Sequence, residues 1–512
     1  MARRGETPGE ATAGRRIAWA LAAAKLVLHL VFIRGYGIFR DELYYLDTAR
    51  HLDWGYVDQP PLIAVVAWLT SLFGDSLLAI RLPAALAGAA LVLLAAALAR
   101  EMGGGAFAQG IAALAVIVAP GYLLFHHILT MNAFEPLFWM GAAWVLLRYL
   151  KTRDSRLWIA FGGITGLGLL NKHSMAFYAF ALVAGLLLAG EWRFLRERGF
   201  WLGALFGVLI VLPHLVWQAR HDFPQLEILR VTRAHRDVRL APGAFLLAQV
   251  QSMNPASVPL WLSGVVFYFT RRGRPFGPLG WSFLVVLLIF LGMQAKFYYL
   301  WPAYPILFAG GGVLLESLFA PARRRWLRPL TAGVMLAGGI FLAPFMLPVL
   351  PVERFVRYAR ALGFEEIQTE NQRQGALPQW YADMHGWKEM AQAVARVHET
   401  LPPEERAKAV VLAQDFGQAG AINHFGPALG IPRAISGHNS YYLWGPGDAT
   451  GEVLIVIGDE KEDLERGFEE VEAAGITDHP WARPDEVGLT IWICRKPRAP
   501  IRQLWPLVRF YG

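Results

Sequence analysis

The chain has 512 residues, of which 55% are hydrophobic and 17% are charged. Because a soluble domain carries about 25% charged residues, this composition argues against an ordinary soluble protein, and recurring long apolar runs predict a polytopic membrane protein. The single cysteine, Cys494, excludes an intrachain disulfide and a cysteine-based metal cage. The net charge is +8, and in a membrane protein such an excess is expected from Lys and Arg in cytoplasmic loops. The charge therefore does not indicate a nucleic acid as a partner.

Apolar segments recur through the first two thirds of the chain and predict a bundle of about eleven transmembrane helices. The first segment is interpreted as a retained helix, because no small-residue cleavage site follows the basic N-terminal residues. The segments lie near residues 17–36, 78–99, 106–125, 128–148, 157–170, 175–190, 200–217, 257–270, 279–294, 302–319 and 328–349.

The links between these segments alternate between arginine-rich and nearly uncharged, which predicts the orientation in the membrane. The first basic link is the N-terminus, so residues 1–16 are predicted to be a cytoplasmic tail and 17–350 a transmembrane domain. The link 218–256 is an outer one that nevertheless carries five arginines. It is interpreted either as a solvated segment near lipid headgroups or as a binding surface for phosphate. A bacterial inner membrane is the expected location.

Residues 351–512 are mixed in charge and contain no segment long enough to span a membrane, which predicts a soluble α/β domain outside the cell membrane. The runs AVVLAQ, EVLIVIG and LTIWICR are expected to be buried strands. Asp415 is placed to cap a helix over 416–429, and 460–474 reads as an acidic helix.

A stretch rich in carboxylates and aromatic rings, FRDELYYLDTARHLDWGYVDQPPL, follows the first apolar segment and opens the outer loop 37–77. Carboxylates facing lipid are costly, so these groups are expected to face water or a polar cavity. One interpretation is an interfacial helix with its Tyr and Trp side chains at headgroup level. The other makes Asp41 a general base or metal ligand at the mouth of a cavity, with the aromatic residues of the stretch, Tyr44, Tyr45, Trp54 and Tyr56, forming a platform for a sugar or lipid.

Further polar groups interrupt the apolar segments. Glu135 lies a third of the way into a span, and Lys172 and Lys296 lie at segment ends. A charged group at mid-membrane costs roughly 2.5–3.5 kcal/mol on insertion scales, so each needs a partner or water. For the two lysines the alternative is snorkelling of the amine toward the interface. Together these groups predict a polar cavity in the outer half of the bundle.

Four motifs occur in order along the chain: the acidic stretch above, then GDSLLAIRLPAAL, GLGLLNKHS and KFYYLWPAYP. In this order they resemble glycosyltransferase family 39 and its bacterial relatives, which include protein O-mannosyltransferases, aminoarabinose transferases and galacturonosyltransferases. The resemblance covers roughly residues 17–320. It implies a GT-C type helical bundle, a sugar donor on a polyprenyl phosphate, and a lipid, glycan or protein acceptor hydroxyl at the outer face.

The resemblance also implies roles for individual residues. Asp41 matches the family's motif aspartate and is expected to be the general base, supported by Glu42. A departing lipid phosphate needs positive charge or hydrogen-bond donors. The residues expected to bind donor phosphate or substrate are Lys296, Arg81, Tyr44, Tyr45, Glu135, Lys172, Tyr298 and Tyr299.

This sequence departs from the family pattern at two points. Gln59 stands before the two prolines where some relatives have a lysine, and Asn132 stands where many relatives have an aspartate, with Glu135 one turn later. A divalent metal ion is left open, with Asp58 and His221 as its candidate ligands. No other cofactor is expected.

Two other classes of protein are weighed against a glycosyltransferase. A transporter or flippase of lipid-linked precursors would also place polar groups inside its bundle, but it would more often show inverted repeats, which this sequence lacks. An envelope assembly protein that is only anchored by its helices would not need Glu135 or the acidic stretch. A Walker loop and a dinucleotide fingerprint are both missing, so nucleotide sugars and ATP are not expected as substrates.

Overall fold

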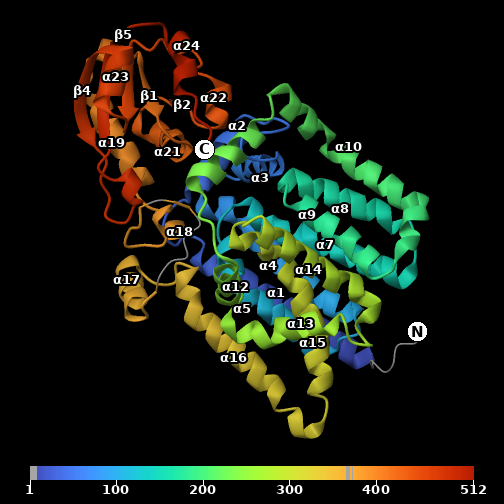
Figure 1. The fold of residues 1–512 in the computed structure, drawn as a ribbon. Coiled ribbons are helices and arrows are strands. Elements are labelled where there is room, and N and C mark those ends of the chain that lie inside the picture. The colour runs from blue at the N-terminus through green and yellow to red at the C-terminus, as the bar shows by residue number, and fades with distance from the viewer. Residues whose placement is uncertain (1–7, 365–369, 372) are drawn as a thin grey trace. The chain divides into compact units, whose positions relative to one another are not determined.

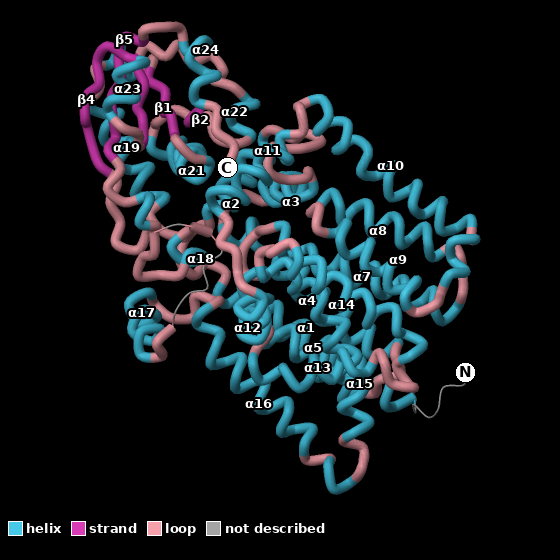
Figure 2. The backbone as a smooth tube through the Cα atoms, in the orientation of Figure 1, coloured by secondary structure: helices cyan, strands magenta, loops and turns pink. Residues whose placement is uncertain are grey.

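The computed structural model describes residues 8–364, 370–371 and 373–512. Most of these residues are helical, and the strands all belong to one sheet in the C-terminal part of the chain (Figure 1 and Figure 2). The chain divides into two compact units. The first, here called the helical unit, comprises Met1–Gly35, Leu78–Val216 and Val238–Thr369, and the second, here called the sheet unit, comprises Tyr36–Leu77, Trp217–Asp237 and Glu370–Gly512.

The helical unit is built from apolar helices, as the long apolar runs predict. A 3₁₀ turn at Phe297–Ala303, η5, precedes α15. The main helices are α1 (Pro8–Phe32), α4 (Leu77–Glu101), α5 (Ala106–Val118), α6 (Pro120–Phe125), α7 (Met131–Thr152), α8 (Leu157–Asn171), α9 (Met175–Leu188), α10 (Arg198–Arg220), α12 (Pro242–Ser252), α13 (Val258–Phe267), α14 (Gly277–Gly292), α15 (Tyr304–Leu318), α16 (Leu327–Leu342) and α17 (Val352–Ala361).

Each of the eleven predicted apolar segments contains a helix, although one segment is divided. Over 106–125 the expected single helix is replaced by α5 and α6, because Ala119 is extended before Pro120, which starts the second helix. Within the described part of the chain, four helical segments are long and apolar enough to cross a membrane. These are Leu77–Glu101, Arg198–Arg220, Arg274–Gly292 and Ala322–Phe345. The number of helices that cross the bilayer stays a prediction.

Glycines allow α13 and α15 to pack backbone to backbone. A Cβ atom added at Gly264 would lie 2.1 Å from the Leu307 carbonyl oxygen, and one added at Gly311 would lie 1.9 Å from the Leu260 carbonyl oxygen. Both distances are far below van der Waals contact. Small residues at helix contacts are typical of membrane bundles, where close packing replaces the hydrophobic effect as the source of association.

The sheet unit combines Tyr36–Leu77, which contain the predicted outer loop, with Trp217–Asp237 and the C-terminal residues. Its helices are α2 (Arg40–Arg50), α3 (Leu62–Ser71), α11 (Pro224–Val231), α18 (Gln379–Ala382), α19 (Trp387–Thr400), α20 (Pro403–Arg406), α21 (Phe416–Phe425), α22 (Ser440–Trp444), α23 (Lys461–Gly467) and α24 (Ile501–Leu504). Its strands are β1 (Ala409–Ala413), β2 (Ala434–Ser436), β3 (Val453–Ile457), β4 (Phe468–Ile476) and β5 (Thr490–Pro497).

The five strands are ordered β2-β1-β3-β5-β4, with β1 parallel to β2 and β3, and β5 antiparallel to β3 and β4. Alternate residues of each strand face opposite sides of the sheet. On one side, Leu454 and Cys494 pack with Leu464 of α23, Ile501 of α24 and Trp505 in a single apolar core. The sheet is therefore covered by its own helices and forms a mixed α/β layer.

The three predicted strands are confirmed, and Asp415 caps α21 by accepting a hydrogen bond from the Gln418 backbone N–H at 2.8 Å. The prediction of a helix over 460–474 is partly wrong, because α23 ends at Gly467 and β4 begins at Phe468. The acidic residues of β4 are acceptable in a strand because β4 is at the edge of the sheet, where side chains remain solvated.

Candidate functional site

Asp41 lies in the first turn of α2, where a carboxylate is favoured by the helix dipole. Its side chain is 33% exposed, and its Oδ1 lies 3.8 Å from Nε of Arg40. Burial raises the pKa of Asp41 above its usual value, and the carboxylate of Glu370 acts in the same direction, whereas Arg40 and Arg236 lower it. The group is therefore accessible and more basic than an ordinary aspartate.

Glu42, the neighbour of Asp41, is fully buried. Its Oε2 accepts a hydrogen bond from the Phe39 backbone N–H at 2.8 Å, which closes the N-terminus of α2. In this structure Glu42 fixes the turn that carries Asp41, and its supporting role in catalysis stays a prediction.

Tyr44 and Tyr45, predicted to form a ligand platform, are both buried. The Tyr44 hydroxyl donates to Oδ1 of Asp58 at 2.9 Å and lies 2.8 Å from Oγ of Ser440. Burial raises the pKa of Asp58 to about 7. Buried rings offer no open face to a sugar. In this structure both rings pack inside the sheet unit, and the Tyr44 hydroxyl fixes the Asp58 carboxylate by a hydrogen bond.

Asp47 connects α2 to the rest of the sheet unit. One of its oxygens accepts from the Asn423 amide at 2.6 Å and from the Tyr441 hydroxyl, while the other pairs with Arg50. The side chain is buried, so these donors compensate for the loss of water. Asp47 therefore anchors the helix on which Asp41 is presented.

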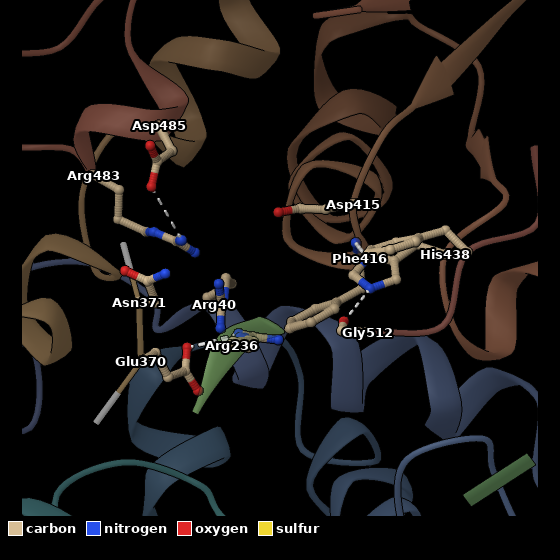
Figure 3. Close-up of a pocket in the computed structure, with 11 residues that line it drawn as sticks. Arg40, Arg236, Glu370, Asn371, Asp415, Phe416, His438, Arg483, Asp485 and Gly512 are labelled. Carbon is tan, nitrogen blue, oxygen red and sulfur yellow. Dashed lines mark hydrogen bonds and ion pairs between the residues drawn. The ribbon is translucent and has the colours of Figure 1, made fainter. Parts of the chain in front are cut away.

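A cavity of about 240 Å³ lies in the sheet unit beside Arg40 (Figure 3). Arg40 is 6% exposed, and its guanidinium lies 4.8 Å from the centre of the Phe416 ring. The cavity is lined by Arg40, Arg236, Glu370, Asn371, Asp415, Phe416, His438, Arg483, Asp485, Phe510 and Gly512.

Two arginines that line this cavity lie close to carboxylates of the sheet unit. Arg236 lies 2.8 Å from Oε2 of Glu370, and Nε of Arg483 lies 3.5 Å from Oδ1 of Asp383. Asp383 is 1% exposed, and burial raises its pKa to about 7. Sequence reasoning missed all three of Arg40, Asp383 and Arg483. Arg40 lies in the acidic stretch but the resemblance gives it no role, and Asp383 and Arg483 are distant in sequence and belong to no motif.

In the helical unit, four of the predicted substrate-binding residues come together. Nζ of Lys172 lies 3.0 Å from Oε2 of Glu135, and it also lies 4.4 Å from the centre of the Tyr299 ring and 5.6 Å from that of Tyr298. Lys172 also donates to Oδ1 of Asn132 at 2.6 Å. The lysine, the carboxylate and the rings come from three separate segments of the sequence.

Two other predicted cations differ in their surroundings. Arg81 is fully buried and donates to the Ile33 backbone carbonyl at 3.0 Å. Contact between Arg81 and a ligand phosphate would need exposure that this side chain lacks here. Lys296 is half-buried, immediately before η5, the turn that carries Tyr298 and Tyr299.

The candidate metal ligands Asp58 and His221 have other hydrogen-bond partners. Asp58 accepts from Tyr44, and Nδ1 of His221 lies 2.8 Å from the Trp217 backbone carbonyl. Within residues 8–364, 370–371 and 373–512, no three His, Cys, Asp or Glu side chains gather in a way that could hold a metal ion. A metal at Asp58 and His221 stays a prediction.

Comparisons with known proteins agree with this architecture. Residues 58–217 match the model of the dolichyl-phosphate-mannose-protein mannosyltransferase family. ArnT from Cupriavidus metallidurans bound to undecaprenyl phosphate matches with a TM-score of 0.61 at 16% identity, over 92% of this chain and 97% of that chain. This chain has the fold of ArnT. The match confirms the predicted GT-C type bundle with a C-terminal α/β part and the resemblance expected from the motifs.

Further comparisons give the range of similarity. ArnT in the apo state matches with the same TM-score of 0.61, at 18% identity and the same coverage of 92% and 97%. The mycobacterial arabinofuranosyltransferase AftD matches with a TM-score of 0.49 at 17% identity, over 78% of this chain and 29% of that one. None of the curated proteins compared matches this chain.

Proposed function

We propose that this chain is a membrane glycosyltransferase that moves a sugar from a polyprenyl-phosphate carrier to a hydroxyl of a lipid, glycan or protein acceptor. One observation carries the proposal: the ArnT fold extends over 92% of the chain, and a structure of ArnT with this fold holds undecaprenyl phosphate. The match of residues 58–217 to a dolichyl-phosphate-mannose-protein mannosyltransferase model supports the same class of donor.

In this proposal Asp41 is the general base. The acceptor oxygen attacks the anomeric carbon, the bond from that carbon to the phosphate oxygen breaks, and the electron pair leaves with the lipid phosphate. The acceptor proton passes to the Asp41 carboxylate. Partial exposure gives an acceptor access to Asp41, and its raised pKa brings its basicity closer to neutral pH.

Lys172 is proposed to neutralise the phosphate of the donor. Its ammonium has three N–H donors, of which Asn132 and Glu135 accept two. The third donor and the positive charge are suited to a phosphate oxygen that gains charge as the sugar departs. Tyr298 and Tyr299 flank the ammonium and limit its movement, and Lys296 is proposed to add positive charge to the same role.

The location follows from the charge of the loops. We propose a bacterial inner-membrane protein with residues 1–16 in the cytoplasm, 17–350 as the transmembrane domain and 351–512 outside. The acceptor hydroxyl is then glycosylated at the outer face, where the loop 37–77 carries Asp41.

A donor panel tests this function. The purified full chain in sealed proteoliposomes is offered polyprenyl phosphates carrying different sugars, together with lipid, glycan and peptide acceptors, with and without chelator. Release of free polyprenyl phosphate from one donor, with transfer of its sugar, is the expected result. Loss of activity with chelator would show that the reaction needs a metal, for which Asp58 and His221 are the candidate ligands. Movement of the intact lipid-linked sugar across the bilayer without cleavage would contradict the proposal and indicate a flippase.

A further inference from the structure

The cavity beside Arg40 contains buried hydrogen-bond donors that the proposed reaction does not use. Nε of Arg40 and both Nε and Nη1 of Arg483 are buried and have no hydrogen-bond partner among the residues that the structure describes. Their nearest carboxylate contacts are 3.8 Å from Arg40 to Asp41 and 3.5 Å from Arg483 to Asp383, which are too long for hydrogen bonds. Figure 3 shows the guanidinium groups of Arg40, Arg236 and Arg483 directed into the same space.

Burying a guanidinium N–H without an acceptor is unfavourable, and a bound oxyanion would supply the missing acceptors. The planar fork of an arginine suits the paired oxygens of a phosphate or carboxylate. Phe416 lies against Arg40 and keeps that guanidinium in place.

Two of the side-chain carboxylates that line the cavity have other partners. Glu370 pairs with Arg236 at 2.8 Å, and Asp415 accepts from the Gln418 backbone N–H at 2.8 Å. Asp485 lies 3.7 Å from Arg483, which is again too long for a hydrogen bond. Arg40 and Arg483 therefore keep buried N–H groups to which a bound anion could supply acceptors.

We propose that this cavity binds an oxyanion, a phosphate or a carboxylate, carried by the acceptor substrate. The inference rests on the proposed glycosyltransferase function and adds to it the chemical class of the acceptor. The cavity, at about 240 Å³, is larger than a phosphate group and leaves room for part of a sugar beside the Phe416 and Phe510 rings.

Binding of small probes to the full chain in neutral-lipid nanodiscs tests the site. Inorganic phosphate and glucuronate represent the two oxyanions, and glucose is the uncharged control; the readout is the shift of the thermal unfolding midpoint with probe concentration. We expect at least one oxyanion to raise the midpoint and glucose to leave it unchanged. Stabilisation by phosphate and not by glucuronate would assign a phosphorylated acceptor, and the reverse would assign an acidic sugar.

Variants then locate the binding. Arg483→Gln is expected to weaken oxyanion binding at least tenfold, and Arg483→Lys, which keeps the charge that faces Asp383 but loses the fork, is expected to weaken it while preserving the fold. Arg466→Gln, at an exposed arginine of the same unit, is the matched control and should leave binding unchanged.

Lys172→Gln separates this site from the proposed donor site. Loss of binding in Lys172→Gln with retention in both Arg483 variants would overturn the inference, as would no binding of either oxyanion to the unmodified chain. If the chain transfers no sugar from any donor while Arg483-dependent binding persists, the proposed function and the link to an acceptor fail, and the anion site itself stands.

Discussion

Nζ of Lys172 lies 3.0 Å from Oε2 of Glu135, and the Glu135 side chain is 2% exposed. The pair joins the first residue after α8 to the second turn of α7, so a lysine that could have snorkelled to the interface is instead held inside the helical unit. The hydroxyl of Ser174 donates to the other oxygen of Glu135. The buried carboxylate therefore has an ammonium on one oxygen and a hydroxyl donor on the other.

Removing Lys172 should destabilise the protein more than removing the whole pair. Lys172→Met leaves a buried, unpaired carboxylate and is expected to cost about 3–5 kcal/mol of unfolding free energy, whereas Lys172→Met combined with Glu135→Leu should recover most of that loss. Denaturant unfolding in detergent measures both variants. If Lys172 binds the donor phosphate, both variants should also lose sugar transfer from the polyprenyl-phosphate donor.

The matched control is Lys151→Met, because Lys151 pairs with Glu101 on an exposed face of the same unit. A cost below about 1 kcal/mol is expected there. If Lys172→Met combined with Glu135→Leu is as unstable as Lys172→Met alone, an unpaired Glu135 carboxylate is not the cause of the lost stability.

Asp47 should be critical for stability although it has no proposed chemical role. Asp47→Ala leaves the buried Asn423 amide and Tyr441 hydroxyl without their acceptor and should lower the unfolding free energy by about 3 kcal/mol. Asp448→Ala, at an exposed position of the same unit, is the control and should change little. A thermal unfolding midpoint for Asp47→Ala equal to that of the control would refute the anchoring role.

Stability should fall as the pH rises through about 7, in part because of Asp383. Its pKa is raised from the usual 3.8 to about 7 in the folded state, so the folded protein holds the proton more tightly than the unfolded chain does. This contribution to stability is fully present below about pH 4 and is lost as the pH rises through about 7. Asp383→Asn, which stays neutral, should therefore lose less stability than the unmodified protein between pH 5 and pH 8.

Unfolding midpoints of both proteins at pH 5 and pH 8 give the comparison. Asp58, whose pKa is also raised to about 7, contributes to both proteins alike and cancels in the difference. Parallel pH dependence of the two proteins would show that Asp383 does not titrate in this range.

As the pH is lowered, the transfer rate should begin to fall at a pH above the usual pKa of an aspartate. A general base must be deprotonated to accept the acceptor proton, and the pKa of Asp41 is raised by burial. The rate should therefore fall as the pH decreases through a value higher than 3.8. A rate that stays constant down to the usual pKa of an aspartate would show that Asp41 does not limit the reaction.

The sequence predicts helices and strands better than it predicts which residues of different segments lie close together. Apolar runs and β-rich runs indicate most helices and three of the five strands, because burial dictates composition. The acidic strand β4 and the short β2 are missed, because β4 owes its form to pairing with β5 rather than to its own residues. Motif resemblance selects Asp41, Glu135 and Lys172. No local pattern links Arg40 to Arg483, since their proximity follows from the fold.

Buried side chains mark another limit of sequence reasoning. Aromatic residues beside acidic ones suggest a platform for a ligand, and Tyr44 and Tyr45 fit that pattern. The structure instead buries both rings, because α2 packs into the sheet unit and uses the Tyr44 hydroxyl to hold Asp58. Exposure depends on the packing of distant segments and cannot be read from neighbouring residues.

The role of Asp41 is tested most directly by comparing transfer by the unmodified chain and by Asp41→Asn on the same polyprenyl-phosphate sugar. If Asp41 is the general base, the variant should transfer at a rate lower by a factor of about 10² to 10⁴, with an unchanged unfolding midpoint. Asp448→Asn, the exposed control, should transfer at the unmodified rate. Transfer by a correctly folded Asp41→Asn at close to the unmodified rate would contradict the assignment of Asp41 as the base.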